Sequence, residues 1–343
     1  EAIDNNFTHY SPVPGYENLR KAISGKFKRD NGLNYGPGQI VVSTGAKQAL
    51  MNVVLSLVNP GDEVLLPTPY WVSYIEMVKM AEGVPVMISA GIDRDFKVTS
   101  DQIKRAITPK TKLLIFSSPC NPSGSVFSGE ELKRIAGVIK EHENIYIVAD
   151  EIYEHIIYNG KHTSIAGIDG MYDRVITVNG VSKSFAMTGW RIGYIGAPEW
   201  IANGCTKIQG QFTSGASSIS QMAALAAINS DPSTTVEMVE IFKKRRDLLL
   251  ALLKEVPGLK SNIPQGAFYV FPDVSYYFGK SSGGRGIATS TDLCMYLLDT
   301  AYVALVSGEG FGEPDYIRIS YACEEEQIKM AVSRIKSALE KLK

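Results

Sequence analysis

The chain has 343 residues, of which 45% are hydrophobic and 21% are charged, and its formal net charge is -1 at pH 7. This composition is typical of a globular protein, and the balanced charge, without a Lys/Arg-rich run, argues against a nucleic-acid partner. No uninterrupted apolar stretch reaches the roughly 18 residues that a membrane span needs, and no signal peptide opens the chain, so we expect no membrane partner.

Four cysteines lie far apart in the chain and form no Cys-x-x-Cys pair: Cys120, Cys205, Cys294 and Cys323. This spacing matches neither a zinc site nor a disulfide framework, so we predict reduced thiols, no bound metal and a cytoplasmic location. The chain opens on Glu-Ala-Ile-Asp, without an initiator methionine. We therefore expect a chain that has been trimmed at its amino end.

Between about residue 15 and residue 230, short β-branched runs alternate with amphipathic stretches. Buried strands are predicted at residues 39–43, 63–66, 84–88, 113–116, 146–149, 175–178 and 192–195. After the first strand, Leu50, Val53, Val54, Leu57 and Val58 repeat at helical spacing. Continuous apolar strands between helices are typical of a mostly parallel sheet that is covered on both faces. The predicted fold class is α/β, with a large domain over residues 1–232.

The pattern changes after Asp231-Pro232. A long helix is predicted over residues 236–256, followed by a strand over 267–271 and a second helix. Strand-like runs then occupy residues 303–306 and 316–320, before a charged terminal helix. These elements predict a smaller α+β domain over residues 233–343. Within it, residues 280–286 are rich in Ser and Gly and predict a mobile loop.

Lys183 lies in the stretch Ser182-Lys183-Ser184-Phe185, and Arg191 follows eight residues later. A lysine amine that is partly removed from water can form a Schiff base with an aldehyde. An arginine framed by small residues can bind two phosphate oxygens at once. Because a lysine between serines is most often a surface residue, this interpretation depends on the other residues of the site.

Polar residues also follow two of the predicted strands. Asp150 and Tyr153 come after the strand at 146–149, and Asn121 follows the strand at 113–116 in Asn-Pro-Ser-Gly. Ligands of open α/β sheets bind at the carboxyl ends of strands, so we expect these groups at one crevice. Asp150 could keep a pyridine nitrogen protonated, and the other two could donate to a deprotonated ring oxygen. A helix cap, a packing tyrosine and an ordinary turn are the alternatives.

Four further positions could complete such a site. Gly45 and Ala46 open a predicted helix, where backbone N–H groups can face a phosphate. The dinucleotide fingerprint and the P-loop are absent from the sequence, so we predict a single phosphate monoester. Trp71 could stack on a flat ring or be a core aromatic residue. Arg318 alternates with apolar residues in its strand and needs a carboxylate, either from the protein or from a substrate.

Taken in chain order, four motifs resemble those of the fold-type I, pyridoxal-phosphate-dependent class I aminotransferases, and especially the bacterial aspartate aminotransferase branch. The motifs are Asn121-Pro122-Ser123-Gly124, Asp150-Glu151-Ile152-Tyr153, Ser182-Lys183-Ser184-Phe185 and Trp190-Arg191-Ile192-Gly193. The resemblance extends from about Tyr10 to Lys343. It implies pyridoxal 5'-phosphate as cofactor, and a homodimer whose partner subunit supplies Tyr10.

The resemblance also implies a role for each site residue. Lys183 would bind the cofactor covalently and then move the substrate proton. Asp150 would pair with the ring nitrogen, Asn121 and Tyr153 with the ring oxygen, and Trp71 would stack on the ring. Gly45, Ala46, Ser182, Arg191 and Tyr10 would hold the phosphate. Arg318 would bind the substrate α-carboxylate, with Trp71 and Asn121 beside it, and Lys47 the distal carboxylate of a dicarboxylic substrate.

The implied reaction is a ping-pong transamination between an L-amino acid, most of all aspartate, and 2-oxoglutarate. A prephenate or aromatic aminotransferase is the first alternative. A carbon–sulfur lyase or a cyclopropane-carboxylate synthase on the same fold is the second. A non-enzymatic regulatory module is disfavoured because Lys183, Asp150 and Arg318 are all present. The family's amino-terminal segment, which carries a substrate-facing glycine and a lid, is expected to be missing before Glu1.

Overall fold

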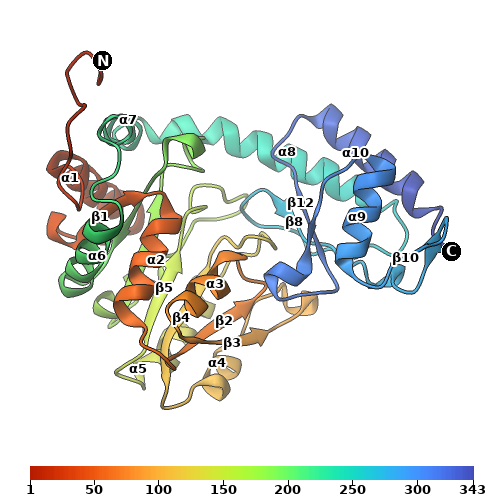
Figure 1. Cartoon of the computed structure of the whole chain (residues 1–343), viewed down its shortest axis with the longest axis horizontal. Helices are drawn as coiled ribbons and strands as arrows, with labels where there is room; N and C mark the ends of the chain where they lie inside the picture. The colour runs from red at the N-terminus through yellow and green to blue at the C-terminus, as the bar shows by residue number, and fades with distance from the viewer.

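The computed structural model describes the backbone of residues 1–343 and every side chain except that of Pro232. A large lobe is built on one seven-stranded sheet with the order β1-β7-β6-β5-β4-β2-β3, and a smaller lobe lies beside it (Figure 1). The strands are β1 (Ile40–Thr44), β2 (Glu63–Thr68), β3 (Val84–Ser89), β4 (Thr111–Ser117), β5 (Tyr146–Asp150), β6 (Val175–Gly180) and β7 (Ile192–Gly196). All seven predicted strands are therefore present.

The sheet is mostly parallel. The pairs β2–β3, β2–β4, β4–β5 and β5–β6 are parallel, whereas β7 runs antiparallel to both β6 and β1. Parallel neighbours need long crossover connections, which here are mainly helices. This arrangement confirms the α/β prediction.

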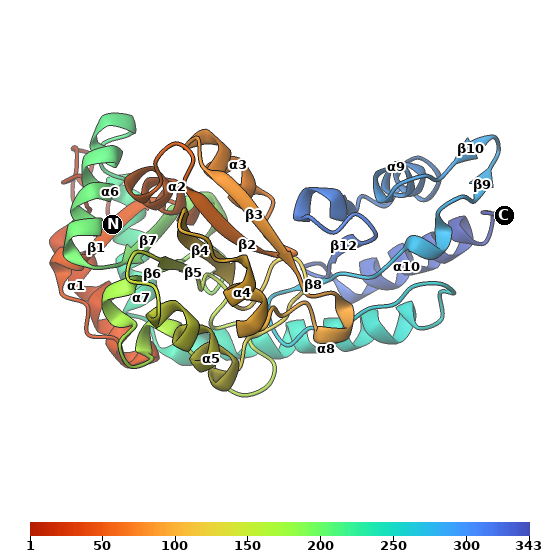
Figure 2. The same cartoon turned by 90° about the horizontal axis from the view of Figure 1, so that it is seen from below.

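Helices cover both faces of the sheet. They are α1 (Glu17–Lys26), α2 (Ala46–Leu57), α3 (Ser73–Met80), α4 (Ser100–Ala106), α5 (Gly129–Lys140), α6 (Glu199–Phe212) and α7 (Ser218–Ile228). The apolar side chains of α2, α3 and α6 pack on one face, and those of α1, α4, α5 and α7 on the other (Figure 2). Alternate strand residues supply the two cores: Leu65 joins one, while Val64 and Leu66 join the other.

The smaller lobe combines an antiparallel sheet with three helices. Its sheet has the order β11-β12-β8, formed by β8 (Tyr269–Val270), β11 (Val306–Ser307) and β12 (Ile317–Ser320). The helices α8 (Val236–Leu253), α9 (Ser290–Ala301) and α10 (Glu325–Leu339) pack around it. In both views α8 extends from the large lobe to the smaller one (Figures 1 and 2). The predicted smaller α+β domain is confirmed, whereas the boundary between residues 232 and 233 stays a prediction.

Several predicted elements of the smaller lobe differ from the structure. The helix predicted over 236–256 ends at Leu253, the strand predicted over 267–271 covers only 269–270, and the strand predicted over 303–306 is replaced by β11 at 306–307. The hydrogen-bonded strands are shorter than the apolar runs that predicted them. A residue belongs to a strand only where a neighbouring strand pairs with it.

Residues 280–286 form a hairpin, so the predicted loop is wrong. The hairpin pairs β9 (Ser281–Ser282) with β10 (Arg285–Gly286). Its turn residues Gly283 and Gly284 have φ values of 58° and 81°, which suit a tight hairpin. Backbone hydrogen bonds between Ser281 and Lys343 join it to the carboxyl end of the chain. The Ser and Gly content correctly indicated a turn. The residues on either side form strands because of these backbone hydrogen bonds, which the composition does not indicate.

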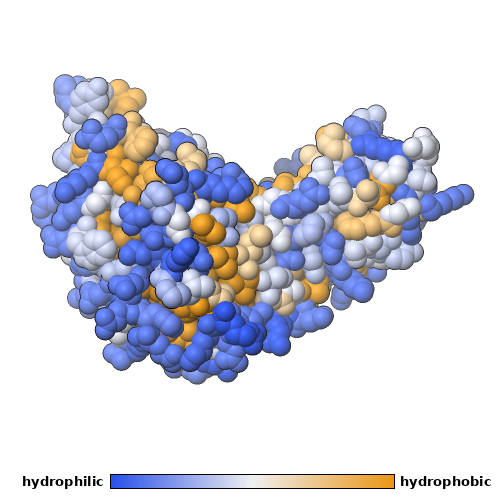
Figure 3. Space-filling view, turned by 60° about the horizontal axis from the view of Figure 1, so that its bottom comes forward, coloured by the Kyte–Doolittle hydropathy of each residue, from blue (hydrophilic) through white to orange (hydrophobic). Residues whose placement is uncertain are grey.

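The two lobes leave a broad indentation on the face shown in Figure 3. Within the molecule, a cavity of about 260 Å³ lies where strands β4 and β5 end, and its lining includes Ser117 and Asp150. Arg318 on β12 enters the same cavity from the smaller lobe. Among the described residues, no helix is both long and apolar enough to cross a membrane.

Candidate active site

The cavity collects most of the predicted site residues. Ten of them line it: Ala46, Lys47, Trp71, Asn121, Asp150, Tyr153, Ser182, Lys183, Arg191 and Arg318. Gly45 lies directly behind this lining, against Arg191. Tyr10 does not line the cavity, and its side chain is 97% exposed. Its predicted position beside the phosphate of a partner subunit stays a prediction.

Asp150 forms the buried floor of the cavity at the end of β5. Its Oδ2 accepts a 2.7 Å hydrogen bond from the Tyr74 hydroxyl, and its Oδ1 accepts a 3.3 Å bond from the backbone N–H of Ile152. Burial raises the pKa of Asp150 to about 6, although both hydrogen bonds oppose this shift. A cation placed against this carboxylate would therefore be strongly stabilised.

Lys183 approaches from the segment that follows β6. Its ammonium nitrogen lies 5.7 Å from the ring centre of Tyr153 and 5.6 Å from that of Phe268. Burial lowers the pKa of Lys183, and the positive charges of Arg318 and Arg191 lower it further, while Asp150 acts in the opposite direction. A lysine with a lowered pKa is more often unprotonated, which is the form that attacks a carbonyl carbon.

The amino end of α2 and Arg191 form a cradle suited to an anion. Gly45 precedes α2 with φ of 83°, and a Cβ at this position would collide with the Arg191 guanidinium. Arg191 also has a left-handed backbone, and its Nη1 donates a 3.0 Å bond to the carbonyl of Thr188. The first turn of α2 contains no acidic residue, so its free N–H groups and the arginine offer an uncompensated positive site.

Trp71 is a wall of the cavity, and it is half-buried. The Lys47 ammonium lies 4.9 Å from the Trp71 ring centre. This cation–π contact keeps an exposed lysine at the edge of the cavity. Trp71 thus offers a flat apolar surface, and Lys47 a positive charge beside it.

Arg318 is held by one hydrogen bond and two aromatic rings. Its Nη1 donates a 2.9 Å bond to Oδ1 of Asn121. Its guanidinium carbon lies 4.6 Å from the ring centre of Tyr269 and 5.1 Å from that of Phe311. Among the described residues, no carboxylate forms an ion pair with Arg318, and its buried Nε has no hydrogen-bond partner. Of the two partners that the sequence allowed, the geometry favours a carboxylate from a ligand.

Two functional contacts could not be foreseen from the sequence. Tyr74 lies three residues after Trp71 at the start of α3, and this helical spacing was the one available signal. Tyr269 lies on β8, and its hydroxyl is 2.9 Å from that of Tyr153. The apolar run that contains Tyr269 resembles any core strand, so nothing in the sequence distinguished this tyrosine from a packing residue.

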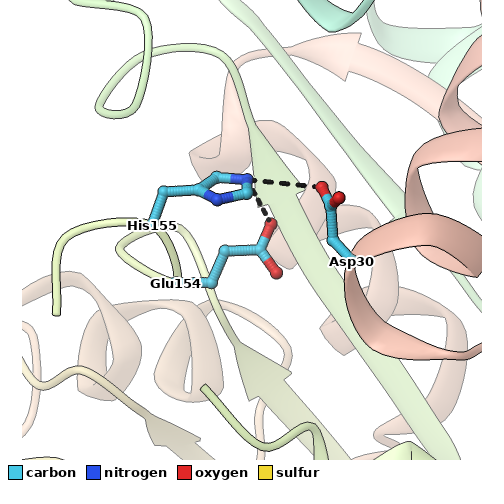
Figure 4. A group of neighbouring side chains, drawn as sticks. All are labelled: Asp30, Glu154 and His155. Atoms are coloured by element: carbon cyan, nitrogen blue, oxygen red, sulfur yellow. Dashed lines mark ion pairs between the residues drawn. The ribbon is translucent and has the colours of Figure 1, made fainter. Parts of the chain in front are cut away.

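A cluster of ion pairs lies outside the cavity lining. Figure 4 shows His155 between two carboxylates, with Nε2 at 3.5 Å from Asp30 and 3.3 Å from Glu154. The Lys26 ammonium also contacts Glu154. Burial alone would raise the pKa of Glu154, but Lys26 and His155 hold it well below its usual range. Glu154 is therefore already paired with side chains of the chain itself, and the prediction that no metal binds stays a prediction.

These ion pairs hold the segment that carries three cavity residues. Asp150, Ile152 and Tyr153 line the cavity, whereas Glu151 and Glu154 from the same segment do not. Glu151 instead lies 3.0 Å from His162 and accepts a 2.7 Å bond from Ser164. The segment is thereby fixed from outside the cavity lining, and so are the side chains that it presents to the cavity.

The fold and the cavity together define an α/β enzyme in which a lysine of lowered pKa shares a cavity with a buried carboxylate and with Arg318, whose Nε has no hydrogen-bond partner. The profile of the family described as Aminotransferase class I and II matches residues 1–335. The chain belongs to this family. The resemblance found in the four motifs is thus confirmed.

Individual relatives agree with this assignment. A bifunctional aspartate aminotransferase and glutamate/aspartate-prephenate aminotransferase of Petunia hybrida is 49% identical over all of this chain and 72% of its own length. An aspartate aminotransferase of Rhizobium meliloti is 42% identical over all of this chain and 84% of its own length. A crystal structure of the aspartate aminotransferase from Rhizobium meliloti superimposes with a TM-score of 0.96, at 42% identity, covering 100% of this chain and 86% of that one.

Proposed function

We propose that this protein is a pyridoxal-phosphate-dependent aminotransferase that moves the amino group of an L-amino acid, most of all aspartate, to 2-oxoglutarate by a ping-pong mechanism. The observation that carries the proposal is the meeting of Lys183, Asp150 and Arg318 in one cavity. They come from the segment after β6, the end of β5 and β12 of the smaller lobe. Family membership and the names of the relatives support the same reaction.

The residues of the cavity fit pyridoxal phosphate at each of its functional groups. The cradle of Gly45, Ala46 and Arg191 suits the phosphate, with Ser182 beside it. Asp150, whose burial disfavours an unpaired negative charge, suits a protonated ring nitrogen. When bound, the cofactor supplies an aldehyde that Lys183 and the substrate amine can each attack, and a ring that withdraws electrons from the substrate Cα.

The ring itself would lie between the side chains that line the middle of the cavity. Trp71 offers a face for stacking. The oxygen of the Asn121 amide is occupied by Arg318, so its NH₂ group remains to donate to a ring oxygen. The hydroxyl of Tyr153 is a second donor for the same oxygen. These roles agree with those that the resemblance implied.

Lys183 moves the proton in this proposal. Its amine, whose pKa is lowered by burial and by Arg318 and Arg191, would take the proton from the substrate Cα. Asp150 would keep the ring nitrogen protonated, and the cofactor ring would accept the electrons that remain when this proton leaves. Lys183 would then return the proton, and in a ping-pong order the first 2-oxo acid would leave the cavity before the second enters.

Arg318 is the carboxylate-binding residue. Asn121 and the rings of Tyr269 and Phe311 fix its guanidinium, which leaves its Nε and further N–H groups for the substrate α-carboxylate. Lys47, at the outer edge beside Trp71, is the group that we assign to the distal carboxylate of aspartate.

A prephenate or aromatic aminotransferase is the second candidate. The Petunia hybrida relative carries both an aspartate and a prephenate activity in its name. The Trp71 wall next to Lys47 offers an apolar surface as well as a charge, which would suit either class of side chain. No residue of the cavity specifically favours the lyase or cyclopropane-synthase alternatives.

A homodimer in the cytoplasm forms part of the proposal. Met80 and Phe212 are 71% and 70% exposed and line an apolar cavity that Lys47 and Arg191 also border. A second subunit would cover these side chains beside the active site, and its Tyr10 is the residue that we assign to the phosphate. The four unpaired cysteines agree with a reducing compartment.

The proposal is tested by incubating the protein with 2-oxoglutarate and each of a panel of L-amino acids, and by measuring the glutamate that forms. We expect aspartate to give the highest kcat/KM, and the aromatic amino acids a lower one. Release of ammonia with pyruvate and no glutamate would contradict transamination and favour a lyase. The Lys183→Ala protein is the control for background reaction.

A further inference from the structure

Tyr269 connects two parts of the cavity that the proposed mechanism uses separately. Its hydroxyl lies 2.9 Å from that of Tyr153, and its ring lies under the Arg318 guanidinium at 4.6 Å. Tyr153 is a ring-oxygen donor in the proposed function, and Arg318 is the carboxylate-binding residue. One side chain of the smaller lobe therefore contacts both.

The strand pairing explains how Tyr269 reaches Arg318. Ser320 of β12 lies opposite Tyr269 of β8, and Arg318 is two residues away from Ser320 on the same face. Diagonal neighbours in an antiparallel pair are close enough for long side chains to touch. The contact is thus fixed by the backbone ladder.

Either hydroxyl of the pair can be the donor, and a ligand would set the direction. Each phenol has one proton to donate. If Tyr153 gives its proton to a ligand oxygen, it must accept from Tyr269, and Tyr269 is the available donor at 2.9 Å. Tyr269 is 6% exposed, so most of its side chain is shielded from solvent. A hydrogen bond from Tyr269 to Tyr153 would polarise the Tyr153 hydroxyl and so strengthen its hydrogen bond to the ligand oxygen.

We propose that Tyr269 is a positioning residue for the reaction: its hydroxyl donates to Tyr153 and its ring face orients Arg318. This inference rests on the proposed function, because both partners act there on the cofactor or on the substrate. Tyr269 does not take up or release a proton in the reaction. It sets the donor strength of one partner and the orientation of the other.

The two contacts can be separated by substitution. Tyr269→Phe removes the hydroxyl and keeps the ring, while Tyr269→Leu removes both. The control is Tyr321→Phe, because the Tyr321 hydroxyl is also buried, also lies 2.9 Å from another tyrosine hydroxyl, that of Tyr158, and does not line the cavity. Tyr153→Phe and the Tyr153→Phe/Tyr269→Phe double variant complete the set.

The first readout is the pH midpoint of the visible absorbance that Lys183 gives with bound pyridoxal phosphate, measured without substrate. A hydroxyl that donates to the ring oxygen stabilises its negative charge, so a weaker donor raises this midpoint. We expect Tyr269→Phe to raise it by about half a pH unit, Tyr153→Phe to raise it more, and the double variant to match Tyr153→Phe. Tyr321→Phe should leave it unchanged.

The second readout is the dissociation constant of maleate, a dicarboxylate that cannot react. We expect Tyr269→Phe to stay within about twofold of the parent protein, because the ring under Arg318 remains, and Tyr269→Leu to bind about 3- to 30-fold more weakly. An unshifted midpoint in Tyr269→Phe, or unchanged maleate binding in Tyr269→Leu, would overturn the inference while the proposed function stands. A parent protein without pH-dependent absorbance, or one whose absorbance survives Lys183→Ala, would overturn both.

Discussion

The Tyr74 hydroxyl donates a 2.7 Å hydrogen bond to Oδ2 of Asp150, and both side chains are buried. The bond joins the start of α3 to the end of β5 across the floor of the cavity. It stabilises the ionised carboxylate, yet burial still raises the pKa of Asp150 to about 6. An isolated Asp150 charge is therefore unfavourable in the folded protein.

This pKa predicts a pH-dependent stability for the protein freed of cofactor. The pKa of Asp150 is about 6 in the folded protein against 3.8 in the unfolded chain. The protonated carboxyl therefore contributes most to the free energy of unfolding below pH 4, and that contribution is lost as pH rises to 6. The free energy of unfolding of Asp150→Asn should therefore exceed that of the parent protein by up to about 3 kcal/mol at pH 7. Below pH 4 the two proteins should have equal free energies of unfolding. Urea denaturation at both pH values measures this, and an equal difference at the two pH values would contradict it.

Lys183→Ala should lose at least about 1000-fold in kcat, because the amine that moves the Cα proton is absent. The measurement is glutamate formation from aspartate and 2-oxoglutarate. Lys133→Ala, which removes an exposed lysine paired with Glu130, is the control and should match the parent protein. Turnover that survives in Lys183→Ala would assign the proton transfer to another group.

Gly45→Ala should weaken the binding of pyridoxal phosphate by at least about tenfold, because the new Cβ displaces the Arg191 guanidinium. Gly61→Ala is a matched control, since Gly61 has φ of 82° but no atom within contact distance of an added Cβ. Both variants carry the strain of a positive φ, and Gly45→Ala should lose about 1 to 3 kcal/mol of stability because its ψ of 160° lies in a region that side chains rarely adopt. Equal cofactor affinities in the two variants would show that the effect is only backbone strain.

Arg318→Lys should raise the KM for aspartate by about 10- to 100-fold with a smaller change in kcat, because an ammonium cannot bind a carboxylate through two parallel N–H groups. Steady-state kinetics and maleate binding both measure this loss. Arg285→Lys, at an exposed ion pair with Asp299, is the control. If KM stays constant, the substrate α-carboxylate binds elsewhere.

Lys47→Ala should reduce kcat/KM for aspartate more than for an aromatic amino acid, by about tenfold, because it removes only the charge at the outer edge of the cavity. Parallel kinetics with aspartate and phenylalanine measure the ratio. Equal losses for both substrates would exclude Lys47 from the choice of substrate.

The sequence by itself determined the α/β class, the seven strands of the large sheet and the polar residues that follow them. Hydrophobic periodicity is a local property of the chain, and residues at strand ends must meet at one edge of a parallel sheet. Asn121, Asp150 and Tyr153 could be placed in one crevice for that reason. The short strands of the smaller lobe and the hairpin at residues 280–286 could not, because their pairing depends on distant partners.

Only the tertiary structure decided which groups touch within the site. The bonds Tyr74–Asp150, Tyr153–Tyr269 and Arg318–Asn121 join residues that are 76, 116 and 197 positions apart. The altered pKa values of Asp150 and Lys183 likewise arise from burial and from charges on other elements. Side-chain direction and desolvation are set when the lobes pack together, so a linear pattern contains the residue types of this chemistry but not their contacts.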